Sequence, residues 1–177
     1  MPSETPVPPK RKINIELLLS LSATFLSLAA LIVSVFQTKI AREEQHATVW
    51  PYLQLGASSN STTYDYGIEN RGIGPAIIKK VEWVYGDSVY KHSHEFIFNE
   101  IGFSRGLGRS EMEPNQVYSP AGGASLISVY ENDSLVKVVS KILESDSFRL
   151  RIIYSDVYGN CWQLDKGKTE KLEDCPE

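Results

Sequence analysis

Hydrophobic residues follow two different patterns in this chain, one near the N-terminus and another after residue 50. Residues 17–36 contain no charged side chain. At about 1.5 Å per residue in a helix, about 20 such residues cross the roughly 30 Å hydrocarbon core of a bilayer. The first pattern therefore predicts one transmembrane helix, over residues 13–37.

A cleaved signal peptide is the main alternative for such a segment. Its apolar region usually covers about 7–15 residues and ends in small residues of the A-x-A type. Here the apolar stretch is longer, and Val35, Phe36 and Gln37 do not form such a pattern. We therefore predict a retained anchor, preceded by a polar and basic tail at residues 1–12 and followed by a charged helical stalk at residues 38–49.

Small and polar residues form one stripe on the predicted helix, because they recur at alternating spacings of three and four. They are Ser20, Ala23, Ser27, Ala30 and Ser34. A stripe of small residues lets two helix backbones approach closely, which is the usual basis of helix association in lipid. This predicts self-association; chance alignment of common membrane residues is the alternative.

After residue 50 the pattern changes to that of strands. Short runs rich in β-branched and aromatic residues are separated by Gly, Asn, Ser and Pro, which is typical of a β-sandwich. These runs lie at residues 52–56, 62–70, 75–85, 88–98, 124–130 and 147–159. The clearest run alternates Phe148, Leu150, Ile152 and Tyr154 with Arg149 and Arg151. Residues 50–177 are therefore predicted to form an all-β, immunoglobulin-like sandwich.

One stretch in this region has helical rather than alternating spacing. Its apolar residues are Leu135, Val138, Val139, Ile142 and Leu143. This spacing predicts one short amphipathic helix at about residues 134–144, capped by Asp133 or Ser134.

Charge and cysteine content limit the possible functions and locations of the protein. A formal net charge of −4 and a pI near 5.5 do not suit nucleic-acid binding, which normally requires a basic face. Lys10, Arg11 and Lys12 precede the helix and only Lys39 and Arg42 follow it closely, so the N-terminus is predicted to be cytoplasmic. Cys161 and Cys175 can then pair in an oxidising compartment; in a cytoplasmic domain they would remain thiols.

The motifs that suggest catalysis are weak. Residues 102–106 match G-x-S-x-G around Ser104, but all the histidines precede that serine and the flanking residues do not predict the required helix. His92 and His94 point to one face of a predicted strand and could share a metal, although a third ligand is not visible. We predict no enzymatic activity, no cofactor and no metal site.

Two turn motifs carry a resemblance to a known group of proteins. Residues 70–78 read NRGIGPAII, and residues 154–160 read YSDVYGN. The chain resembles, over residues 17–160, a scattered group of bacterial membrane-anchored proteins with an immunoglobulin-like β-domain and an N-x-G-x-G-P-A turn. Physically, this motif indicates a structural turn, in which Gly72 and Gly74 supply positive φ and Pro75 begins the next strand.

The resemblance implies a location and a role. Proteins of this build occur in bacterial defence cassettes, including retrons, where a membrane protein is the effector that damages the cell. The expectation is therefore a non-enzymatic effector or interaction protein of the inner membrane, with a periplasmic β-domain. Its expected partners are the lipid bilayer, further copies of itself and an unidentified protein. The alternative is a non-toxic scaffold or ligand-binding module in the envelope.

Overall fold

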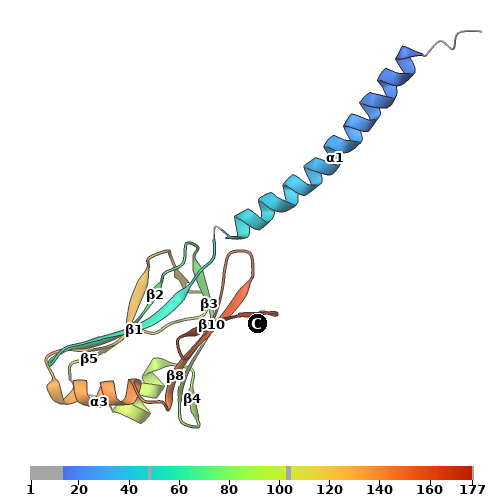
Figure 1. Ribbon diagram of the computed structural model, residues 1–177. Coiled ribbons are helices and arrows are strands. Elements are labelled where there is room, and N and C mark those ends of the chain that lie inside the picture. The colour runs from blue at the N-terminus through green and yellow to red at the C-terminus, as the bar shows by residue number, and fades with distance from the viewer. Residues whose placement is uncertain (1–13, 48, 103–104, 177) are drawn as a thin grey trace, which may run out of the picture. The chain divides into compact units, whose positions relative to one another are not determined.

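The computed structural model describes residues 14–47, 49–102 and 105–176, and it divides the chain into two compact units, Met1–Glu44 and Gln45–Glu177. Among the described residues, the first unit is formed by the single uninterrupted helix α1, Ile15–Ala47, whose last three residues belong to the second unit (Figure 1). The apolar stretch of α1 is exposed within the described residues. By length and composition α1 is a membrane anchor. The predicted basic tail lies outside the described residues.

The helix is longer than a bilayer core requires. About 11 residues of α1 follow Phe36, so the helix continues about 16 Å beyond the uncharged stretch at 1.5 Å per residue. This continuation contains the charged sequence that was predicted as a stalk.

The second unit is a sandwich of two antiparallel sheets. One sheet has the strand order β1-β2-β7-β5; the other has the order β10-β9-β8-β3-β4, with β6 also paired to β3. The strands are β1 Leu53–Ser59, β2 Tyr64–Asn70, β3 Ala76–Tyr85, β4 Ser88–Tyr90, β5 Leu107–Arg109, β6 Val117–Tyr118, β7 Gly123–Val129, β8 Phe148–Ser155, β9 Cys161–Asp165 and β10 Lys168–Leu172. The predicted fold class, a transmembrane helix followed by an all-β domain, is confirmed.

The two sheets enclose one hydrophobic core. It contains fully buried side chains from both sheets, such as Leu53 and Leu126 on one side and Ile78 and Leu150 on the other. In β8 the predicted alternation is confirmed, because Phe148, Leu150, Ile152 and Tyr154 are buried while the two arginines are partly exposed. Period-two burial of this kind places one face of a strand in the core.

Two helical segments lie side by side at one end of the sandwich (Figure 1). The helix α3, Asp133–Leu143, confirms the predicted amphipathic helix, although its N-cap is Asn132, whose side chain accepts the Leu135 N–H at 3.0 Å. The other segment was predicted to continue the strand at residues 88–98, and that prediction was wrong. After β4 the chain forms α2, Ser93–Phe96, which continues as the π-helical turn η1, Ile97–Ile101.

Candidate functional site

The stripe of small residues on α1 is exposed along its whole length. Ser20, Ala23, Ser27, Ala30 and Ser34 all belong to α1 and are all exposed. Residues three and four apart share a helix face, so these five side chains form one narrow surface. The hydroxyl of Ser20 donates to the carbonyl of Leu17 at 2.9 Å, so it is satisfied within its own helix. The stripe therefore offers close packing rather than polar contacts at that position.

The strand β1 is an unusual sheet edge. It contains seven residues, pairs only with β2 among the described strands, and contains no charged residue and no proline. The other edges are either very short, as in β4 and β5, or charged, as in β10 with its two lysines and one glutamate. Natural sheets normally shorten, charge or cover their edges to prevent pairing with other chains. Among the edges of the described sheets, only β1 after its buried first residue, Leu53, lacks all three protections.

The backbone of β1 presents donors and acceptors at its open side. The Arg71 N–H donates to the carbonyl of Tyr52, and the Asn60 N–H donates to the carbonyl of Thr63. Because bonded and outward-facing residues alternate in an antiparallel pair, the even-numbered residues of β1 bond β2. The odd-numbered residues therefore face outward. The N–H of the buried Leu53 donates to the Tyr154 hydroxyl at 3.5 Å. The open positions are Leu55, Ala57 and Ser59.

A shallow groove of about 430 Å³ runs over the outer face of the same sheet, across β1, β2 and β7. The residues at the centre of this face have small side chains, which leaves room for the groove. Gly56 is paired with Gly67, which is in turn paired with Ser125. A side chain at Gly67 would collide with the carbonyl oxygen of Ala124, whereas Gly56 faces open space. The groove therefore lies directly beside the open edge of β1.

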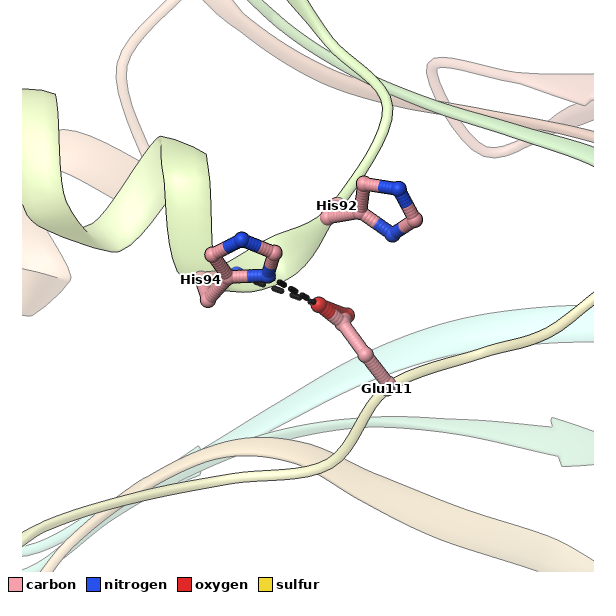
Figure 2. A group of neighbouring side chains, drawn as sticks. All are labelled: His92, His94 and Glu111. Atoms are coloured by element: carbon pink, nitrogen blue, oxygen red, sulfur yellow. Dashed lines mark hydrogen bonds and ion pairs between the residues drawn. The ribbon is translucent and has the colours of Figure 1, made fainter.

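His92, His94 and Glu111 form a cluster at the start of α2 (Figure 2). His92 precedes the helix in an extended conformation, and His94 lies in its first turn. Their rings stack with centroids 5.3 Å apart. Glu111 comes from the segment between β5 and β6, and its carboxylate points at the ring of His94, with Nδ1 and Oε1 3.0 Å apart.

The carboxylate of Glu111 also holds the beginning of α2. It accepts the backbone N–H of Ser93 at 2.8 Å and that of His94 at 3.3 Å. Partial burial acts to raise the pKa of Glu111, but the hydrogen bonds from Ser93 and His94 outweigh it, so the pKa lies below the ordinary value. Glu111 is therefore a carboxylate at neutral pH.

The ligand atoms of the three side chains all lie within 4.8 Å of one another, so this cluster could hold a metal ion. The sequence predicted that His92 and His94 share a strand face, but the structure brings their rings together at a helix start instead. The third ligand that sequence reasoning missed is Glu111, 17 residues from His94. No spacing rule connects a helix start to a loop so far along the chain.

Cys161 and Cys175 are joined by a disulfide, with their Cα atoms 5.4 Å apart. The bond connects the beginning of β9 to the segment after β10. Cys161 is buried and Cys175 is exposed. The disulfide thus ties the C-terminal end of the described chain to the sheet.

The turn containing Gly72, Gly74 and Pro75 lies against the segment that enters the domain. Neither glycine has positive φ, so the predicted reason for them was wrong. A side chain at Gly72 would overlap the backbone of residues 50–52, and one at Gly74 would overlap the carbonyl of Val49. Pro75 precedes β3, which begins at Ala76. The glycines are required by close backbone approach.

The second motif, at residues 154–160, is a turn held by its own residues. The carboxylate of Asp156, which is buried, accepts the backbone N–H groups of Tyr158 and Asn160 at 2.8 and 2.9 Å and the side-chain amide of Asn160 at 2.8 Å. Ser104, in the G-x-S-x-G sequence, lies outside the described residues.

No protein-family model, curated protein or solved structure matches this chain.

Proposed function

We propose that this chain is a non-enzymatic, membrane-anchored interaction protein that works as a homo-oligomer. The observation that carries the proposal is the open edge of β1, which is long, uncharged and unprotected. An exposed edge binds another strand through backbone hydrogen bonds, and the neighbouring side chains supply specificity. A second copy of the same chain is the occupant that this edge fits best.

The sequence of β1 suits pairing with itself. Two antiparallel copies centred on Gly56 place Gln54 opposite Ser58 of the second copy, and Leu55 opposite Ala57. The outward-facing odd residues then meet one another, as an antiparallel ladder requires. Because no residue of β1 is charged, this arrangement brings no like charges together.

The helix and the disulfide support the same assembly and its location. Anchoring by α1 confines all copies to one membrane, which raises their effective concentration, and the stripe of small residues allows close helix contact. The Cys161–Cys175 bond favours an oxidising compartment for the domain. We place the N-terminus in the cytoplasm and the β-domain in the periplasm, at the inner membrane of a bacterium.

Two roles fit such an assembly. In the first, clustering of α1 compromises the membrane, and the protein is the damaging arm of an anti-phage system of the retron type. In the second, the clustered domains hold a protein or ligand near the membrane without toxicity; the groove beside β1 favours this role.

A cysteine crosslinking experiment tests the β1 contact. Gly56→Cys is introduced into the full chain, at a position where an added side chain meets open space. Directly opposed residues of a non-hydrogen-bonded antiparallel pair have Cα atoms about 4.5 Å apart, close enough for a disulfide. We expect a covalent dimer in membranes after mild oxidation. Ser88→Cys, at the exposed edge of β4, is the matched control and should remain monomeric.

Charge exchange then tests the register. Gln54→Lys with Ser58→Lys, or Gln54→Glu with Ser58→Glu, places like charges opposite each other in a homodimer. Each double variant alone should reduce the crosslink yield several-fold, and co-expression of the two should restore it. The crosslink yield is compared in the parent Gly56→Cys chain, in each double variant alone and in the co-expressed pair. Equal yields in all four would show that β1 does not pair with itself.

A further inference from the structure

We propose that His92, His94 and Glu111 bind one divalent transition-metal ion of the zinc class. The three side chains come from two segments that are separate in the chain, the start of α2 and the segment between β5 and β6. Figure 2 shows the two rings and the carboxylate close together, and all three side chains are at least partly exposed.

The donor set selects the class of ion. Imidazole nitrogen suits zinc, copper, iron and nickel, whereas magnesium and calcium prefer sites made of oxygen ligands alone. Two histidines and one carboxylate form a set that zinc and iron sites in proteins use with further positions left open. The chemistry of the side chains therefore points away from the alkaline-earth ions.

The spacing of the donors suits a shared ion. Nδ1 of His94 and Oε1 of Glu111 are 3.0 Å apart. Two ligands of a tetrahedral zinc ion, each about 2.1 Å from the metal, lie about 3.4 Å apart, so a small outward movement of one side chain suits the ion. The three ligand atoms all lie within 4.8 Å of one another, so one ion between them can contact all three after small side-chain movements.

The backbone already holds the carboxylate in place. The N–H groups of Ser93 and His94 donate to Glu111, and Ser93 is fully buried. Outer hydrogen bonds that orient a ligand are a regular feature of protein metal sites. The ligand with the most rotational freedom of its own is thus fixed before any ion arrives.

Bound metal would join two parts of the domain. It would cross-link the segment Ser93–Ile101 to the connection between β5 and β6. Because an ion that binds only the folded state stabilises it by mass action, the melting temperature should rise with metal concentration. All three side chains are at least partly exposed, so the remaining coordination positions are accessible to water or to a donor from another molecule.

A direct titration tests the site. The full chain, purified in detergent without a histidine tag, is titrated with Zn²⁺ by calorimetry and with Co²⁺ by visible absorption. We expect one ion per chain and a higher melting temperature with Zn²⁺. His92→Asn is the informative variant, because that exposed side chain stacks on His94 and takes no part in holding Glu111.

The variants distinguish a metal site from a hydrogen-bonded helix start. His92→Asn should weaken Zn²⁺ binding at least tenfold and abolish the rise in melting temperature, with the metal-free melting temperature unchanged. His46→Asn, which removes the remaining histidine from α1, should bind as wild type. Equal Zn²⁺ affinity in wild type and His92→Asn, or no saturable binding to wild type below 1 mM, would overturn the proposal.

Discussion

The side-chain amide of Asn70 donates to the carbonyl oxygen of Gly74 at 2.8 Å, across the turn that joins β2 to β3. Asn70 is fully buried, and the same amide also donates to the carbonyl of Tyr118 at 3.0 Å. Its oxygen accepts the N–H groups of Tyr52 and Gly72. One side chain therefore ties the turn to the segment that enters the domain and to β6.

This arrangement predicts that Gly74→Ala destabilises the domain. The new methyl group would overlap the carbonyl of Val49, and forcing an extra methyl into a tightly packed position costs about 1–3 kcal/mol. Urea unfolding of the full chain in detergent measures the free energy of unfolding. Gly56→Ala is the control, because its methyl group meets open space and should change stability by less than about 0.5 kcal/mol. Equal effects of the two substitutions would contradict the close approach.

The disulfide predicts a redox-dependent stability. Removing a bond that closes a loop of about 15 residues costs about 3 kcal/mol, and Cys161 and Cys175 are 14 positions apart. Cys161→Ala with Cys175→Ser should lower the free energy of unfolding by about that amount. Dithiothreitol should destabilise wild type equally and leave the double variant unchanged. Thiol labelling of cells that express wild type checks the compartment, since the exposed Cys175 would be labelled in a cytoplasmic domain and blocked by the disulfide in an oxidising one.

The ion pairs on the outer face of the larger sheet predict an acid sensitivity. Arg151 donates to Glu82 at 3.0 Å and to Asp165 at 3.1 Å. The hydrogen bond from Lys80, together with Arg151, holds the pKa of Glu82 below its ordinary value of 4.5, despite partial burial. A carboxyl whose folded pKa is depressed contributes stability above its unfolded pKa and loses it as the pH falls through the folded pKa.

Stability should therefore decline as the pH falls below 4.5, and the decline should be shallower in Glu82→Gln. At pH 7 that substitution should cost on the order of 1 kcal/mol. Thermal unfolding from pH 7 to pH 3 measures both effects. Glu113→Gln, an exposed glutamate between β5 and β6, should follow the wild-type curve. A Glu82→Gln curve parallel to wild type would contradict the assigned ion pairs.

The stripe on α1 predicts that larger side chains at its positions weaken helix association in the membrane. Ser27→Leu with Ala30→Leu should reduce association about tenfold, because helix contacts in lipid are worth on the order of 1–2 kcal/mol. Crosslinking in membranes measures association, and growth after induction measures toxicity. The control, Ser22→Leu with Ala29→Leu, adds the same bulk to the opposite helix face. Growth arrest by wild type that only the stripe variant relieves would support the effector role; harmless expression of wild type would favour the scaffold.

Features that depend on neighbours in the chain were predictable from the sequence. The uncharged stretch of α1, the alternation in β8 and the helical spacing of α3 each express the period of their own element. The hairpin between β9 and β10 was missed although it is also local. Its two-residue turn places Lys166 and Gly167 at positive φ, and a lysine there is a weaker signal than asparagine or aspartate.

The sequence by itself determined the anchor, the β character of the domain and its short amphipathic helix, because hydrophobic periodicity encodes local geometry and burial. Only the tertiary structure decided that Ser93–Ile101 is helical, since Phe96 and Ile97 are fully buried there and a short apolar run fits either a strand or a helix. Packing likewise brought Glu111 to His94, placed Val49 against Gly74 and left β1 at an edge. Contacts between residues distant in the chain depend on how the sheets assemble, which no local pattern contains.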